Sequence, residues 1–324
     1  MEESKSMMNY RPEIKILDAT IRDGGLVNNF YFTDEFVRDL YKANVKAGVD
    51  YMEFGYKASK EMFDVNKFGK WKFCNEDDIR DIVGDNVSDM KISIMADVGR
   101  CDYKNDIIDR KDSAIDMIRV ATYINTMPAA IEMIEDAARK GYETTCNIMA
   151  ISNAKESDMD VALEMLGKSC VDGIYIVDSY GSIYPEQMRS LADKYLAVGE
   201  KYGKQIGIHA HNNQNLAFAN TIESVARGVN LLDATISSMG RGAGNCAMEL
   251  LLGFLKNPKY NLFPVLQFIE KHIVKLKEEG IVWGYDIPYL LTGRLNQHPS
   301  AAIDFTKEDR KDYAEFYQYL LERE

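Results

Sequence analysis

The sequence predicts a (β/α)₈ barrel followed by a C-terminal helical extension, and two observations lead to that fold class. Short apolar runs bounded by turn residues recur eight times, and stretches with helical spacing of apolar residues lie between most of them. This alternation extends over about 250 residues, which suits a closed barrel better than an open doubly wound sheet. No Gly-x-Gly-x-x-Gly motif follows the first strand, as a dinucleotide-binding open sheet would require.

The eight strands are expected at Ile14–Thr20, Tyr51–Gly55, Lys91–Val98, Met117–Tyr123, Glu143–Ala150, Gly173–Asp178, Gln205–His211 and Val229–Ile236. The helical spacing between them is visible, for example, at Phe218, Ile222 and Val225. In such a barrel the carboxyl ends of all strands meet at one rim, where active sites lie. Side chains at the ends of the first and seventh strands are therefore expected to converge.

The seventh strand ends in His209-Ala-His211, which contains two of the four histidines of the chain. Side chains two residues apart on a strand point the same way, so both imidazoles would face one point in space. Two neutral imidazoles can bind one divalent cation. The alternative is a pair of hydrogen-bonded core histidines, because short motifs have many false positives.

The first strand is followed by Arg22-Asp23 and two glycines, a composition that predicts a strand ending in a functional loop. Asp23 would bring a carboxylate to the histidine pair across the barrel mouth. The alternative is a surface ion pair of little energetic consequence.

Five motifs occur in the order and strand positions of the DRE-TIM metallolyase superfamily, which the chain resembles over roughly residues 14–255. They are Asp18-Ala-Thr20-Ile-Arg22-Asp23-Gly24, Glu53-Phe-Gly55, Val177-Asp178-Ser179-Tyr180-Gly181, His209-Ala-His211-Asn212-Asn213 and Gly240-Arg241-Gly242-Ala243-Gly244-Asn245. This superfamily includes HMG-CoA lyase, isopropylmalate synthase and 4-hydroxy-2-oxovalerate aldolase. The chain is most similar to the aldolase type.

The resemblance implies a divalent metal, Mn²⁺ or Mg²⁺, bound by Asp23, His209, His211 and the side-chain oxygen of Asn245. It implies that Arg22 stabilises an enolate, since a guanidinium donates charge-assisted hydrogen bonds without titrating near neutral pH. The reaction expected is the making or breaking of a carbon–carbon bond next to a 2-oxo acid, with an aldehyde as the second small-molecule substrate. The mixed nitrogen and oxygen ligand set suits such ions better than a closed structural zinc site does.

Further site residues follow from the resemblance and from their places at strand ends. The candidates for substrate contact are Thr20, Glu53, Ser179, Gly240 and Gly242, and the candidate hydroxyl groups for proton transfer are Tyr180, Tyr285 and Tyr289. Alternatively, Glu53 could orient a side chain that binds the metal. The glycine run from 240 to 244 could cradle an anion or merely position Asn245.

Two departures from the superfamily concern the acid–base groups. Leu26 stands where the aldolases of this type carry a histidine proposed as the base, and it cannot accept a proton. The loop before Asn245 lacks the cysteine of HMG-CoA lyases, while Cys246, just after it, is expected to be a small buried hydrophobe. The base is left open between a water activated by the cation and a tyrosine of the C-terminal segment.

The barrel is expected to occupy residues 1–255, and residues 256–324 a helical extension. Helices are predicted over 265–280 and 306–322, the second with an apolar stripe that packs on its own domain or forms a subunit interface. A homo-oligomer is expected from the resemblance. The segment 57–76 is a long insertion that could cover the barrel mouth as a lid.

Composition restricts the environment of the protein. A net charge of −12 and the absence of a basic cluster interleaved with aromatic residues argue against nucleic-acid binding. The apolar runs are too short for a membrane span, and Met1-Glu-Glu-Ser-Lys-Ser lacks a signal-peptide pattern, so a cytoplasmic protein is expected. Five cysteines without Cys-x-x-Cys spacing indicate reduced thiols.

Three functions are compatible with the sequence. A metal-dependent aldolase or lyase acting on a 2-oxo acid is the leading one. The second is an acyl-CoA-dependent Claisen-type acyltransferase of the isopropylmalate synthase type. The third is a metal-binding barrel that has lost turnover, a hypothesis motivated by Leu26 and opposed by the complete set of metal and arginine candidates.

Overall fold

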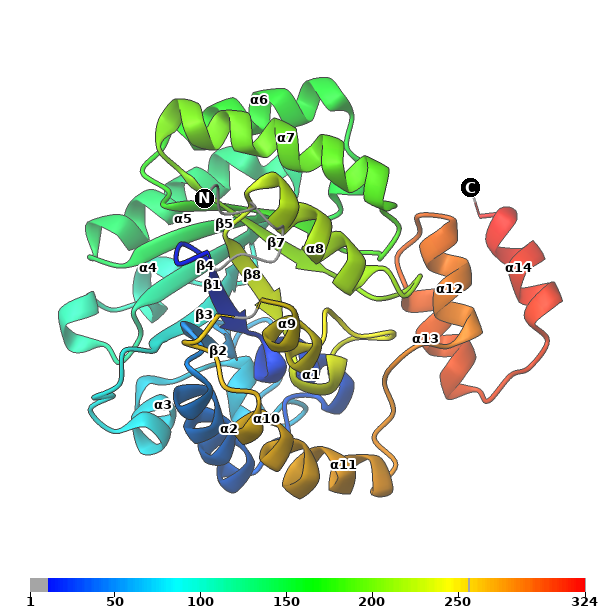
Figure 1. The fold of residues 1–324 in the computed structure, drawn as a ribbon, viewed down its shortest axis with the longest axis horizontal. Coiled ribbons are helices and arrows are strands. Elements are labelled where there is room, and N and C mark those ends of the chain that lie inside the picture. The colour runs from blue at the N-terminus through cyan, green and yellow to red at the C-terminus, as the bar shows by residue number, and fades with distance from the viewer. Residues whose placement is uncertain (1–10, 256, 324) are drawn as a thin grey trace, which may run out of the picture.

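The structure is a computed structural model that describes residues 11–255 and 257–323, and a closed barrel of eight parallel strands forms its centre (Figure 1). Its strands are β1 (Lys15–Asp18), β2 (Tyr51–Tyr56), β3 (Lys91–Asp97), β4 (Met117–Thr122), β5 (Glu143–Ile148), β6 (Gly173–Asp178), β7 (Gln205–Ala210) and β8 (Leu231–Ala234). Each strand pairs with the next in the chain, and β1 pairs with β8 to close the barrel. All eight predicted strands are confirmed. The run Met1–Ser6 considered for a signal peptide lies outside the described residues.

Helices cover the outside of the barrel and continue after it. The α-helices are α1 (Thr20–Asn28), α2 (Asp34–Ala47), α3 (Glu76–Val83), α4 (Tyr103–Asp106), α5 (Met127–Arg139), α6 (Glu156–Lys168), α7 (Pro185–Tyr202), α8 (Ala217–Arg227), α9 (Met248–Leu255), α10 (Phe263–Phe268), α11 (Val274–Glu278), α12 (Ile287–Arg294), α13 (Ser300–Lys307) and α14 (Tyr313–Leu321). Short 3₁₀ segments are η1 (Lys70–Lys72), η2 (Arg110–Asp112), η3 (Ile124–Thr126), η4 (Ile151–Asn153) and η5 (Ile236–Ser238), and η6 (Ile269–Ile273) is a π-helical turn.

The strands are buried along most of their length because both of their faces are covered. Every residue of β2, β4 and β6 is buried, as expected for parallel strands with helices outside and packed side chains inside. The helices begin and end with local signals, and α2 is an example. Thr33 caps its first turn by accepting a hydrogen bond from the Phe36 amide, and Gly48 ends it in the left-handed conformation.

The expected loop after the first strand is wrong, because residues 20–28 form helix α1. Its two glycines serve close packing and not a turn. A Cβ atom on Gly25 would lie 2.1 Å from the Phe30 ring, and one on Gly24 would lie 2.9 Å from Met239. Local preference reads a glycine pair as a turn, but here tertiary contacts leave no room for a side chain and outweigh the helix cost of glycine, about 1 kcal/mol each.

The region after the barrel forms two helical parts. The predicted helix over 265–280 is confirmed as a continuous run from Phe263 to Glu278 that packs on α2. The predicted helix over 306–322 is two helices, because α13 ends at Lys307 and α14 begins at Tyr313. The predicted apolar stripe lies on α14 and consists of Tyr313, Phe316, Tyr317 and Leu320. Its buried members, Phe316 and Leu320, pack against Ala302 and Phe305 of α13, so the stripe packs within the extension.

Helix α12 and the turn after it dock on the loops at the carboxyl ends of the strands. The side chain of Asn213, after β7, donates to the main-chain oxygen of Tyr289 at 3.3 Å. The Asn296 side-chain oxygen accepts hydrogen bonds from the Ser152 and Ser182 hydroxyls at 2.6 and 2.7 Å. The extension is thereby fixed to the rim of the barrel at the loops after β5, β6 and β7.

The segment 57–76 packs beside α1 and contributes no lining residue to the cavity at the barrel mouth. Its Lys72 is buried, with the ammonium group over the rings of Tyr56 and Phe63 at 4.4 Å each. In this structure the segment is therefore part of the wall behind the site and not a cover over it.

All five cysteines are free thiols. No helix in the described ranges is long and apolar enough to cross a bilayer.

Candidate metal centre at the barrel mouth

A cavity of about 420 Å³, counting its part open to solvent, lies at the carboxyl ends of the barrel strands. It is the place where the first and seventh strands bring their terminal side chains together, as the barrel rule predicts. It is lined by Arg22, Asp23, Leu26, Tyr56, Met95, Ala121, Asn147, Met149, Val177, Ser179, His209, His211 and Arg241.

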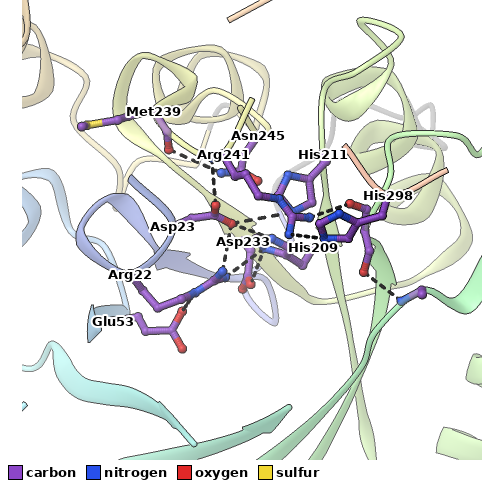
Figure 2. Close-up of polar contacts among 12 residues, drawn as sticks. Arg22, Asp23, Glu53, His209, His211, Asp233, Met239, Arg241, Asn245 and His298 are labelled. Atoms are coloured by element: carbon purple, nitrogen blue, oxygen red, sulfur yellow. Dashed lines mark hydrogen bonds and ion pairs between the residues drawn. The ribbon is translucent and has the colours of Figure 1, made fainter. Parts of the chain in front are cut away.

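Three buried side chains converge in this cavity with geometry that could hold one cation (Figure 2). Asp23 Oδ2 lies 3.2 Å from His209 Nε2 and 3.7 Å from His211 Nε2. Adjacent ligands of an octahedral ion with bonds of about 2.1 Å are about 3 Å apart. The three groups are therefore spaced as neighbouring ligands of a single divalent ion, and none of them needs a large movement to bind it.

Unpartnered polar atoms at the same place also fit a metal ion. His209 Nε2 and Asn245 Oδ1 are buried without a hydrogen bond, although buried polar atoms normally have a partner. The Asn245 amide nitrogen donates to the main-chain oxygen of Met239 at 3.4 Å, which leaves the side-chain oxygen free. Residues 245 and 211 form a β-bridge. Asn245 is thus placed next to the other three candidate ligands.

The orientation of His209 is set by Asp233 at the end of β8. His209 Nδ1 lies 3.0 Å from Asp233 Oδ2. A carboxylate can only accept, so Nδ1 carries a proton, and Nε2, which has no hydrogen-bond partner, is the ring atom that faces the candidate metal position. Asp233 is held in turn by Arg119, whose Nη2 lies 2.6 Å away and whose guanidinium lies over the Tyr175 ring at 4.4 Å.

The same network continues to Arg22 and closes on itself. Glu53 Oε2 accepts hydrogen bonds from Arg119 Nη1 at 2.9 Å and from Arg22 Nε at 2.8 Å. Arg22 Nη1 then donates to Asp23 Oδ2 at 2.9 Å. Two guanidinium groups and three carboxylates form this buried circuit, so it carries one excess negative charge that a divalent cation would more than neutralise.

The charges of this network set the protonation states of the candidate ligands. Burial raises the pKa of Asp23, but Arg22 and then His211 outweigh it and hold the pKa well below its usual value. Burial lowers the pKa of His211 well below its usual value, since the positive charges of Arg241 and Arg22 add to the burial effect. A carboxylate and a neutral imidazole are the forms that bind a metal ion.

The structure brings five of the predicted site residues together in the cavity. Arg22, Asp23, Ser179, His209 and His211 line one cavity. Leu26 lines it as well, so the position at which a histidine was expected does face the site but offers only an apolar surface.

Two predicted substrate contacts lie behind the cavity. The Thr20 hydroxyl donates to Asp18 and accepts a hydrogen bond from the Ile236 amide, and the residue is fully buried. Glu53 is also fully buried, between Arg22 and Arg119. Thr20 therefore ties β1 to the loop after β8, and Glu53 orients Arg22.

The glycines after β8 shape the backbone around Asn245. A Cβ atom on Gly240 would lie 2.2 Å from the Asn245 amide nitrogen, and Gly242, at φ +61°, packs against the Tyr289 ring. The amide of Arg241 between them donates to Asp23 Oδ1 at 3.2 Å. Cys246 is buried, and burial raises its pKa to about 12, so its thiol is a small apolar group here.

None of the three candidate tyrosines lines the cavity. Tyr285 is 52% exposed, Tyr289 packs on Gly242, and the Tyr180 ring lies edge-on to His298. The phenol that does line it is Tyr56, at the end of β2. The sequence contained a signal for Tyr56, because it directly follows the Glu53-Phe-Gly55 motif at a strand end, which is where barrel sites lie.

Comparisons with known proteins agree with this geometry. A family model described as HMGL-like matches residues 13–268. The 4-hydroxy-2-oxovalerate aldolase of Bacillus cereus is 25% identical over 254 residues, which cover 78% of this chain and 73% of that protein. The enzyme of the same name from Pelotomaculum thermopropionicum is 27% identical over 255 residues, covering 78% and 72%. Oxaloacetate decarboxylase of Mycobacterium tuberculosis is 27% identical over 249 residues, covering 74% and 69%.

Solved structures share the fold. The N-terminal domain of a proposed aldolase from Bacteroides vulgatus superposes with a TM-score of 0.76 at 27% identity, covering 90% of this chain and 96% of that one. HMG-CoA lyase of Bacillus subtilis has a TM-score of 0.67 at 16% identity, covering 84% and 95%. The chain belongs to the HMGL-like family, which confirms the resemblance inferred from the five motifs. Within this family, the aldolase and lyase names of its relatives support a carbon–carbon lyase.

Proposed function

We propose that the protein is a divalent-metal-dependent aldolase that makes or cleaves the carbon–carbon bond next to a 2-oxo acid, with an aldehyde as the second substrate. One observation carries this proposal. The potential metal-ligating atoms of Asp23, His209 and His211 all lie within 4.8 Å of one another, in a cavity that Arg22 also lines. Asp23, His209, His211 and the Asn245 side-chain oxygen would hold Mn²⁺ or Mg²⁺. When bound, such an ion supplies Lewis-acid polarisation of the 2-oxo group.

Arg22 is the residue assigned to the charge that develops on the substrate. Cleavage of the bond leaves an enolate, and condensation starts from the same enolate after a proton is lost next to the 2-oxo group. A guanidinium fixed beforehand by Glu53 and Asp23 stabilises the charge on the enolate oxygen without reorganising during the reaction. Because Arg22 is almost fully buried, its hydrogen bonds act where little water competes.

Tyr56 is the proton-carrying hydroxyl that the cavity offers in place of the missing histidine. Its phenol lines the cavity with Arg22, and burial raises its pKa, so the hydroxyl keeps its proton at neutral pH. A protonated phenol can donate to the aldehyde oxygen as that oxygen becomes an alkoxide during condensation. Leu26, Met95, Met149 and Val177 supply an apolar wall that limits water around this step.

Decarboxylation of oxaloacetate is a second candidate, because one relative is named an oxaloacetate decarboxylase and the chemistry passes through the same kind of enolate. The residues assigned above would serve it without change. The two candidate activities therefore differ only in which bond next to the 2-oxo group is broken, and the substrate decides this.

The test is proton exchange at the methyl group of pyruvate in D₂O, measured by NMR with Mn²⁺- or Mg²⁺-loaded protein. Exchange without an aldehyde is expected, because it requires only enolisation. Aldehydes and oxaloacetate are then added separately to distinguish condensation from decarboxylation. The absence of exchange, together with acyl-CoA-dependent release of a thiol, would replace the proposal by the Claisen-type acyltransferase. Absence of both activities in metal-loaded protein would favour a barrel without turnover.

A further inference from the structure

Arg241 is a cation at the cavity that no carboxylate neutralises in the described ranges, 11–255 and 257–323. Its Nη2 donates to the main-chain oxygen of Ser179 at 3.0 Å, and its buried Nε has no hydrogen-bond partner. Arg22, the other arginine of the cavity, differs in this respect because Asp23 and Glu53 both pair with it. A partly buried cation without a counter-charge costs free energy, and a bound anion would reduce this cost.

His298 of the extension reaches Arg241 from the turn before α13. Its Nε2 lies 3.3 Å from Arg241 Nη1 (Figure 2). The Ser300 amide, whose hydrogen direction is set by the backbone, donates to His298 Nδ1 at 3.1 Å. Desolvation and the Arg241 charge lower the pKa of the ring, so it is neutral, and its single proton is on Nε2. Two donors therefore face each other, an arrangement that suits an acceptor shared between them.

The position of His298 is fixed and does not depend on a mobile tail. The neighbouring Asn296 is held by the Ser152 and Ser182 hydroxyls at the ends of the loops after β5 and β6. The Gln297 side chain donates to the main-chain oxygen of Leu320 in α14. The extension thus presents His298 to the barrel in one orientation, beside the edge of the Tyr180 ring.

We propose that Arg241 and His298 form an anion-recognition site for the half of the substrate remote from the 2-oxo acid, so that the preferred acceptor carries a carboxylate or a phosphate. This inference rests on the proposed function, which assigns the 2-oxo acid itself to Arg22 and the candidate metal ligands. An oxygen anion would accept from Arg241 Nη1 and His298 Nε2 together. Charge-assisted hydrogen bonds of this kind are about twice as strong as neutral ones.

The binding test uses two 2-oxo acids that differ only at the far end of the molecule. 2-Oxoglutarate ends in a carboxylate where 2-oxopentanoate ends in a methyl group. Calorimetry of the Mn²⁺-loaded full chain should give at least about tenfold tighter binding of 2-oxoglutarate. Arg241→Gln should reduce this preference to within about twofold, and His298→Ala should reduce it severalfold. Arg294→Gln, which removes an exposed arginine of the same extension, is the matched control and should keep the full preference.

The outcomes separate this inference from the function on which it rests. If both acids bind equally to the unmodified protein, or if Arg241→Gln keeps the preference, the anion site is refuted while the 2-oxo acid site stands. If neither acid binds, both proposals fail. Because Arg241→Gln could disturb folding through the loop that contacts Asp23, Arg241→Lys and a circular dichroism spectrum accompany it, and the lysine variant should retain part of the preference.

A second pair of measurements distinguishes the two anion sources. Condensation with pyruvate is followed for succinic semialdehyde against butanal, and for glyceraldehyde 3-phosphate against glyceraldehyde. A higher kcat/KM for the semialdehyde alone assigns a carboxylate acceptor, and one for the phosphorylated aldehyde alone assigns a phosphate acceptor. A preference for both neutral aldehydes would overturn the proposal.

Discussion

His209 donates a hydrogen bond from Nδ1 to Asp233 Oδ2 at 3.0 Å, and this contact turns its Nε2 toward Asp23 and His211. This hydrogen bond joins the ends of β7 and β8. Arg119, on β4 at the opposite side of the barrel interior, holds the Asp233 carboxylate in place through an ion pair. Asp233 therefore positions a candidate ligand without touching the ion itself, in the way that carboxylates commonly orient metal-bound histidines.

Asp233→Asn should lower Mn²⁺ affinity by about 10- to 100-fold, because an amide orients the imidazole less firmly and loses the ion pair with Arg119. Isothermal titration calorimetry measures the change. Asp193→Asn, which removes an exposed carboxylate paired with Arg227, should leave the affinity unchanged. An unaltered affinity in the Asp233 variant would contradict the positioning role.

Asp23→Ala and His209→Ala should each abolish Mn²⁺ binding, because a site with positions left for substrate has too few fixed donors to spare one. Calorimetry tests this in the absence of substrate. His272→Ala is the matched control, since His272 belongs to a second cluster of metal-ligating groups within residues 11–255 and 257–323, formed with Glu35 and Asp39 of α2. Undiminished affinity in both site variants would refute the site.

Arg22→Lys should leave Mn²⁺ affinity within a few-fold of the parent and reduce turnover by about 10²-fold or more. Lysine keeps the positive charge beside Asp23, but it loses the fork of donors that Glu53 and Asp23 orient. Steady-state kinetics and calorimetry on the same preparation separate the two effects. A collapse of metal affinity with little change in turnover would show a structural role.

Tyr56→Phe should reduce turnover with an aldehyde by about 10²-fold, as expected for loss of a general acid, while pyruvate exchange falls less. Tyr285→Phe and Tyr289→Phe serve as controls because neither ring lines the cavity. Both should retain most of the activity. A large loss in one of these two variants, with metal binding intact, would move the proton-carrying role to the extension.

Asp18 should make stability depend on pH. Burial raises its pKa to about 6, so the folded state favours the protonated carboxyl. The stabilisation is fully present below pH 3.8 and is lost as the pH rises through 6. In Asp18→Asn this dependence disappears, and the unpartnered Asn44 Oδ1 can accept from the new amide. The free energy of unfolding of the variant relative to the parent should therefore increase by about 2 kcal/mol between pH 4 and 8. Denaturant titrations across this range measure it, and an opposite slope would contradict the assignment.

The order of the strands and much of the candidate site could be predicted from the sequence. Apolar strand segments that alternate with amphipathic helical segments must be buried, and parallel strands separated by helices place all their carboxyl ends on one rim. That rule is sufficient to bring Asp23 to His209 and His211, although 186 residues separate Asp23 from His209. The distances among their ligand atoms are properties of the fold.

Local composition was misleading where packing prevailed over propensity. Gly24 and Gly25 predicted a loop, yet they lie in a helix because Met239 and Phe30 occupy the space of their missing side chains. Likewise, the single helix predicted over 306–322 is divided, and its second half packs back on α13.

The barrel, its rim and the residue types that could bind a metal ion follow from periodicity and from the chemistry of each residue, so they could be predicted from the chain alone. Which groups face the cavity depends on packing. Tyr56 lines it and Thr20 does not, and Arg241 meets His298 from a turn 57 residues later in the chain. Such contacts depend on how separate elements pack in three dimensions, whereas a local pattern marks only which residues stand at strand ends, as it does for Tyr56.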